Sequence, residues 1–233
     1  MDRSPRHRTA VEFAVDEIKR RIVEQELRPG ARIDQNIIAE TLGLSRIPVR
    51  QALANLAARG FVVVQAHRSA VVAPLSGAEL RDVYALRCRM EPWAMDEACR
   101  RFGEKEFVAL DGLMDLMERA AQNHDLARYM ELNREFHFAL FAGTENPHLL
   151  RILQGLFDTS ERYQWVYVNA VGSMKVSIQD HREILARMRA GDHDGAIALS
   201  VHHSQKTAEW LRGNVVSSEI EGKREDLTRQ AAG

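Results

Sequence analysis

The chain has 233 residues, of which 45% are hydrophobic and 28% are charged, and its formal net charge is −1. This length and apolar content allow one large or two small domains with a real core. Because the total charge is close to zero, it does not by itself indicate that the chain binds nucleic acid. No apolar run approaches the ~20 residues that span a bilayer, so we expect no membrane partner.

Cysteine content and the N-terminus bear on the location of the protein. There are only two cysteines, Cys88 and Cys99, and the first residues lack the apolar run of a secretory signal. Both features favour a cytoplasmic location with reduced thiols.

The distribution of charge suggests how the chain is divided. Residues 1–75 carry 12 Lys and Arg against 8 Asp and Glu, whereas residues 76–233 carry 20 against 25. A modestly basic N-terminal part on an acidic remainder is typical of a nucleic-acid-binding domain joined to another domain. We predict a DNA-binding domain over residues 1–75, an all-helical domain over 76–213, and a disordered tail over 214–233.

Within the first domain, a mobile basic arm at residues 1–8 precedes an amphipathic helix over 9–27, which the sequence Arg28-Pro29-Gly30 ends. A second helix has an apolar side formed by Ile37, Ile38 and Leu42. Gly43 can adopt the left-handed conformation that ends it.

A third helix begins after the turn and directs Val49, Leu53 and Leu56 inward. Ser45 is its expected N-cap, with a hydroxyl that can accept a backbone N–H, and Gly60 is its expected C-terminal cap.

Two β-branched runs, at residues 61–64 and 70–73, follow the third helix and predict a two-stranded ribbon. Three helices and a ribbon make a winged helix-turn-helix, in which the third helix reads DNA from its N-terminal end. The alternative is a solvated charged face on an ordinary helical hairpin. The candidate DNA contacts are Asn36, Ser45, Arg46, Arg50, Gln51 and, at the tip of the wing, Arg68.

Beyond residue 76 the apolar spacing is helical throughout, and Ser76 with Glu79 matches a capping box. Short loops between amphipathic helices imply an antiparallel bundle. The fold class is therefore mostly α, a winged helix-turn-helix plus an all-α bundle. The predicted helices of the bundle are 77–101, 104–122, 125–142, 146–169, 173–190 and 193–213.

The N-terminal part resembles the GntR family of bacterial regulators, through a Pro29-Gly30 turn followed by Ser45-Arg46-Ile47-Pro48-Val49-Arg50-Gln51-Ala52-Leu53. The helical part resembles the FCD domain of the FadR-like branch. Its matching residues are Arg87, Glu91 and Pro92, Asn133, Phe136 and His137, Asn146 and Pro147, His181 and Arg182, Gly191 and Asp192, and His203. This resemblance implies a ligand-responsive transcriptional regulator, a homodimer that binds double-stranded, pseudo-palindromic operator DNA.

A metal site is the second expectation. Asn133 and His137 share one helix face at i, i+4, and His181 with either His202 or His203 could complete a set of ligands for zinc or another divalent ion. The resemblance favours His203, and zinc is the expected ion, with nickel or manganese as alternatives. The family usually has Asp where this chain has Asn133, and a wing glycine where it has Ser69.

The resemblance also implies a small carboxylic acid as effector, bound beside the metal. Arg87 matches the position from which the branch reaches its ligand, although it could instead form a structural pair with Glu91 at i, i+4. Arg162, Tyr163, Trp165 and Tyr167 are further candidates for the cavity wall. Two rival interpretations are a metalloenzyme, for which the sequence offers no clear general base or nucleophile, and a structural metal site without an effector.

Overall fold

A computed structural model describes residues 9–24, 26–64, 70–171 and 174–231, with side chains placed as far as Asn214 except at 169–171. The chain divides into two compact units that meet between Leu75 and Ser76. The predicted arm at residues 1–8 and the wing tip with Arg68 and Ser69 lie outside the described residues.

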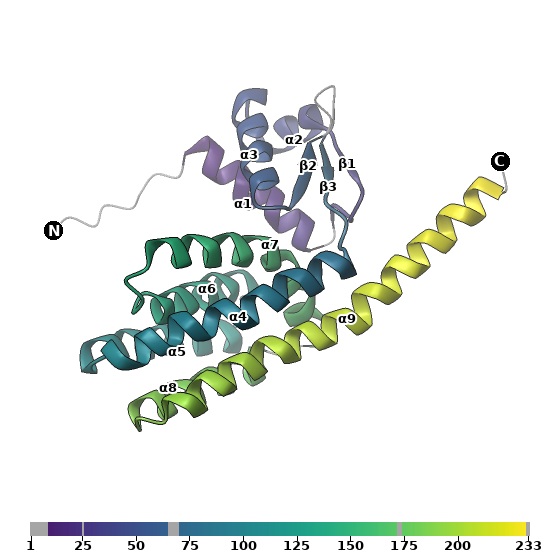
Figure 1. Cartoon of the computed structure of the whole chain (residues 1–233). Coiled ribbons are helices and arrows are strands. Elements are labelled where there is room, and N and C mark those ends of the chain that lie inside the picture. The colour runs from purple at the N-terminus through teal and green to yellow at the C-terminus, as the bar shows by residue number, and fades with distance from the viewer. Residues whose placement is uncertain (1–8, 25, 65–69, 172–173, 232–233) are drawn as a thin grey trace. The chain divides into compact units, whose positions relative to one another are not determined.

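The N-terminal unit is a helix-turn-helix with a small sheet (Figure 1). Its core consists of side chains that the helical spacing predicts to be inward, among them Ile18, Val49, Leu53 and Leu56, each no more than 2% exposed. Its described elements are α1 (Ala10–Val23), β1 (Arg32–Ile33), α2 (Gln35–Leu42), α3 (Arg46–Ala58), β2 (Val62–Val64) and β3 (Ala70–Val72).

The turn between α2 and α3 follows the prediction in part. Gly43 ends α2 with a φ of 65° in the left-handed region, as expected. Ser45 is the N-cap of α3, but its side chain makes no capping hydrogen bond, so that part of the prediction is wrong. Ile37 is 62% exposed, so its assignment to the apolar side of α2 is also wrong.

The sheet has a third strand in addition to the two strands that the β-branched runs predict. Its order is β1-β3-β2, with antiparallel pairing of Arg32 to Val71 and of Val62 to Val72. The N–H of Gly30 donates to the carbonyl of Val72 over 2.9 Å and draws the Pro-Gly turn onto the sheet edge. A strand of two residues is too short to show the alternation from which strands are predicted.

The C-terminal unit is all helical in its described part, which confirms the predicted fold class. In Figure 1, α4 and α9 run side by side, and the contacts show α4 also packed on α7, α5 on α6 and α8, and α8 on α9. The helices are α4 (Gly77–Arg101), α5 (Glu104–Gln122), α6 (Leu126–Phe141), α7 (Pro147–Val171), α8 (Met174–Arg189) and α9 (His193–Ala231).

The ends of these helices agree with the predicted ranges to within two residues, apart from the end of α9. This helix continues to Ala231, beyond the end near residue 213 that the loss of apolar periodicity predicts. The added segment is rich in Glu, Lys and Arg, which favour helix without requiring an apolar stripe.

The start of α4 is tied to α7 by a buried tyrosine. Ser76 caps α4 by accepting the N–H of Glu79, and the N–H of Ser76 donates to the Tyr163 hydroxyl over 3.0 Å. That hydroxyl lies 2.6 Å from Oε2 of Glu79, and Arg162 also pairs with Glu79. These bonds hold the first turn of α4 against the bundle.

Candidate functional site

The N-terminal end of α3 presents a polar surface. Ser45, Arg46, Arg50 and Gln51 are all exposed, as is Asn36 on α2. No hydrogen bond or ion pair ties either arginine to another described residue, so both guanidinium groups can reach a partner outside the chain. Because the first turn of α3 has no side-chain cap, its backbone N–H groups are also available to an anion such as a phosphate.

A cluster of three histidines lies inside the helical unit. His137 on α6, His181 on α8 and His203 on α9 offer ring nitrogens that all lie within 4.8 Å of one another. His137 is 3% exposed and His181 is fully buried. Two ligands about 2.1 Å from one zinc ion are at most about 4.2 Å apart. Small rotations of the rings would therefore bring the three nitrogens onto one ion.

The environment of the cluster keeps its buried imidazoles neutral. Burial first, and then the neighbouring His203, lowers the pKa of both His137 and His181 well below the usual 6.5. Aromatic rings surround them, and Phe136 stacks on His181 with ring centroids 4.5 Å apart. Neutral imidazole is the form that binds metal ions.

Two members of the predicted ligand set have buried polar atoms that lack partners in the described part of the chain. These are Oδ1 of Asn133 and both ring nitrogens of His181. Such atoms cost free energy unless something satisfies them, so they point to a ligand at this place. The donor set of three imidazoles and one amide oxygen fits a divalent metal ion.

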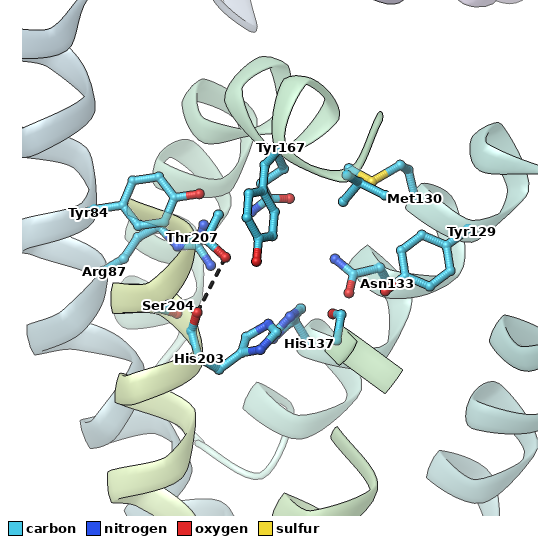
Figure 2. A pocket seen from close by; sticks show the side chains of 13 residues that line it. Tyr84, Arg87, Tyr129, Met130, Asn133, His137, Tyr167, His203, Ser204 and Thr207 are labelled. Carbon is cyan, nitrogen blue, oxygen red and sulfur yellow. Dashed lines mark hydrogen bonds between the residues drawn. The ribbon is translucent and has the colours of Figure 1, made fainter. Parts of the chain in front are cut away.

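A pocket adjoins this cluster, and Figure 2 shows the hydroxyl end of Tyr167 directed toward the side where Asn133, His137 and His203 lie. The free volume of the pocket is about 30 Å³, enough for an ion and a water molecule but not for a metabolite. A larger ligand therefore requires the side chains to move apart.

Arg87 lines the pocket, and it also forms the structural ion pair with Glu91 that the sequence offers as its alternative role. Its Nε donates to Oε1 of Glu91 over 2.6 Å, and another guanidinium nitrogen donates to Ser160 over 3.0 Å. Arg87 is only 2% exposed, and its guanidinium lies 4.0 Å from the ring centroid of Phe157. Ser204 on α9 donates to the other oxygen of Glu91, so the pair joins three helices.

His203 has a carboxylate partner. Its Nδ1 lies 2.9 Å from Oδ2 of Asp180, which also accepts from Lys206 over 2.9 Å. Burial alone would raise the pKa of Asp180, but the hydrogen bonds with His203 and Lys206 outweigh it and lower the pKa to about 2. The carboxylate is therefore ionised at neutral pH.

Of the other candidates for the pocket wall, Tyr167 lines it. Arg162 and Tyr163 instead hold the start of α4, and Trp165 is buried elsewhere in the bundle. Most of the pocket wall could not be predicted from the sequence, because single polar residues on helices usually face water. The lining residues that the sequence did not single out are Tyr84, Tyr129, Met130, Gln164, Val168, Ser177, Ser204 and Thr207.

Comparison with known families assigns both units. The pattern of the bacterial regulatory proteins of the gntR family matches residues 10–72, and that of the FCD domain matches residues 82–206. The chain belongs to the GntR family of transcriptional regulators. The FCD domain fits its FadR-like branch, as the sequence motifs imply.

Curated relatives agree with this assignment, and a solved structure has the same fold. The Nta operon transcriptional regulator of Aminobacter aminovorans is 28% identical over 90% of this chain and 99% of its own length. The regulator McbR of Escherichia coli is 24% identical over 77% of this chain and 82% of its own. In its solved structure, McbR superposes with a TM-score of 0.72 at 21% identity, covering 89% of this chain and 99% of McbR.

This GntR-family chain is therefore a DNA-binding transcriptional regulator and not an enzyme, which removes the metalloenzyme interpretation. Its FCD domain is an effector-binding module of a kind that often binds metal ions. Within the described ranges, no helix combines the length and apolarity needed to cross a membrane.

Proposed function

We propose that the helical domain binds one divalent metal ion, zinc in the first instance and nickel or manganese as alternatives, through Asn133, His137, His181 and His203. The observation that carries this proposal is the convergence of three imidazoles from three helices beside the unsatisfied Oδ1 of Asn133. When bound, the ion supplies a fixed positive charge and open coordination positions for a ligand.

Elemental analysis of the purified protein beside its His181→Ala variant tests the metal site. One ion per chain is expected for the wild type, and less than a tenth of that for the variant. His202→Ala is the matched control, because His202 is exposed on α9 next to His203 and should leave the metal content unchanged. An equal metal content in the wild type and His181→Ala would refute this set of ligands.

We further propose that a small carboxylic acid is the effector, bound between the metal ion and the pocket wall. Arg87 would supply a second positive group, because its planar guanidinium can hold a carboxylate by two hydrogen bonds. The pocket must widen to admit the acid, since its free volume is about 30 Å³. Movement of α4 or α9 around such a ligand would then alter the placement of the DNA-binding units.

A thermal-shift screen of carboxylic acids, with the metal content held constant, tests the effector. A ligand at a hundredfold excess over its Kd stabilises the native state by about 2.7 kcal/mol. The acid that stabilises the wild type should have little effect on His181→Ala. Failure of a broad set of acids to stabilise the metal-loaded protein would contradict the proposal.

For DNA, we propose that Arg46 and Arg50 read base edges or hold phosphates, with Asn36, Ser45 and Gln51 adding polar contacts. Arg68 would act from the wing. A single winged unit reads only a short half-site, so a homodimer and a pseudo-palindromic operator follow, with the cytoplasm as the place of action.

The helical unit offers a surface for that dimer. Leu86 and Trp93 on α4 are 46% and 51% exposed, and Ile152 on the neighbouring α7 is 52% exposed. Leu86 and Trp93 are seven residues apart and so share one face of α4, and large apolar side chains exposed on a helix face are typical of a surface that a partner covers. Light scattering should show a dimer for the wild type and a shift toward monomer for Trp93→Glu. An unchanged dimer would exclude this face.

A further inference from the structure

Asp180 occupies a special place between two of the proposed metal ligands. It precedes His181 on α8, and its carboxylate reaches across to α9, where Oδ2 lies 2.9 Å from Nδ1 of His203. Both side chains are largely enclosed, with exposed fractions of 16% for Asp180 and 12% for His203. One carboxylate thus joins the two helices that carry two of the three imidazoles.

The hydrogen bond determines which nitrogen of His203 is free. An ionised carboxylate can only accept, so Nδ1 of His203 must carry the hydrogen. In the neutral imidazole Nε2 then keeps its lone pair and is the atom that can bind an ion. His181 differs, because neither of its nitrogens has a hydrogen-bond partner among the described residues.

The charge of the proposed metal site also points to a role for Asp180. Asn133 brings a neutral amide oxygen, and neutral imidazoles add no charge, so the four proposed ligands carry no negative charge to oppose a divalent ion. Asp180 carries one and is in direct contact with a ligand. Lys206 lies 2.9 Å from the same oxygen of Asp180 and offsets part of that charge.

We propose that Asp180 is a positioning residue of the metal centre: it holds His203 ready to ligate through Nε2 and supplies from behind that ligand the negative charge that Asn133 does not bring. Lys206 moderates this charge. The inference rests on the metal site proposed above, and it assigns distinct roles to two residues outside the ligand set.

Competition between the full-length, metal-stripped protein and a chromophoric chelator for zinc tests the proposal. Asp180→Asn keeps an acceptor oxygen but loses the charge, and should weaken zinc binding about 10- to 100-fold. Asp180→Ala loses both and should weaken it further. Lys206→Met should tighten zinc binding several-fold, because it removes the opposing charge.

Two further variants make the comparison specific. Asp115→Asn is the matched control, since Asp115 is 59% exposed and pairs with Arg182 of α8 rather than with a histidine, and it should leave zinc affinity unchanged. Asn133→Asp should tighten zinc binding and reduce the effect of Asp180→Asn, because a ligand then brings the negative charge to the ion itself. Far-UV circular dichroism of the metal-free proteins checks that each variant is folded.

The outcomes separate the proposals. If Asp180→Asn and Asp180→Ala bind zinc within twofold of the wild type, the role of Asp180 is refuted while the metal site stands. If Lys206→Met weakens binding as Asp180→Asn does, Asp180 acts only as a structural ion pair, and the inference is again overturned. A wild type that binds no zinc overturns both the metal site and this inference.

Discussion

Replacement of Arg87 by alanine should destabilise the helical unit strongly, because it leaves a charged carboxylate buried without its partner. Arg87 and Glu91 are 2% and 1% exposed, and Nε of Arg87 lies 2.6 Å from Oε1 of Glu91. After the change, Ser204 would be the one described side chain still donating to Glu91.

The magnitude follows from the burial of the pair. Removal of one partner from a buried ion pair costs about 3–5 kcal/mol, whereas replacement of both by apolar residues is often neutral. Arg87→Ala should therefore lower the free energy of unfolding by about 3–5 kcal/mol. The double variant Arg87→Met with Glu91→Leu should recover most of this loss.

Urea unfolding followed by tryptophan fluorescence measures this effect in the relevant unit, because Trp93, Trp165 and Trp210 all lie after residue 75. Arg100→Ala is the control: Arg100 also pairs with a carboxylate four residues away on α4, but its side chain is 69% exposed. This exposed pair should contribute less than about 1 kcal/mol. Equal losses for Arg87→Ala and Arg100→Ala would refute the reasoning.

Three further predictions concern other parts of the helical unit. Since burial lowers the pKa of His137 and His181 well below 6.5, the unfolded chain binds more protons than the folded chain under mildly acidic conditions. The metal-free protein should therefore lose stability as the pH falls below about 6.5, by at most about 1.4 kcal/mol per pH unit for each imidazole. Urea unfolding at a series of pH values measures this slope, and His181→Leu should reduce it. Tyr163→Phe should cost about 1–2 kcal/mol and speed hydrogen exchange at the start of α4, because it removes the hydroxyl that bonds Ser76; unchanged exchange there would contradict this role. Gly143→Ala should lower the melting temperature, since a Cβ there would lie 2.4 Å from the Cα of Ala98, and an unchanged melting temperature would show that the close approach is easily relieved.

The helices could be predicted from the sequence because their apolar stripes are long and regular. The glycine that ends α2 was also predictable, since few residues tolerate its positive φ. Strand β1 could not be predicted, because its two residues are held by partners far along the chain rather than by a local pattern. The extension of α9 was missed because the sequence after residue 213 has no apolar stripe at helical spacing from which a helix could be predicted.

The candidate site was predictable in its ligand types but not in its surroundings. The i, i+4 spacing placed Asn133 beside His137, and the family motif chose His203 over His202. Nothing in the sequence showed that Asp180 would meet His203, because that contact depends on how α8 packs against α9. Both roles of Arg87 follow from the sequence, but its contacts with Ser160 and Phe157 of α7, and the bond from Ser204 of α9 to Glu91, emerge only when these helices pack against α4.

A measurement of operator affinity decides whether the N-terminal end of α3 reads DNA. An operator is first selected from random-sequence DNA with the wild-type protein, and affinities for it and for unrelated DNA are then measured by fluorescence anisotropy at fixed salt. Each arginine that makes a bidentate contact with guanine contributes about 1–3 kcal/mol of discrimination.

The double variant Arg46→Ala with Arg50→Ala is compared with Arg28→Ala with Arg32→Ala, which removes the same charge from exposed positions outside α3. We expect the first variant to lose most of the preference for operator over unrelated DNA. The second should weaken binding to both DNAs alike and keep the preference. An intact preference in the Arg46 and Arg50 variant would contradict the assignment of α3 as the recognition helix.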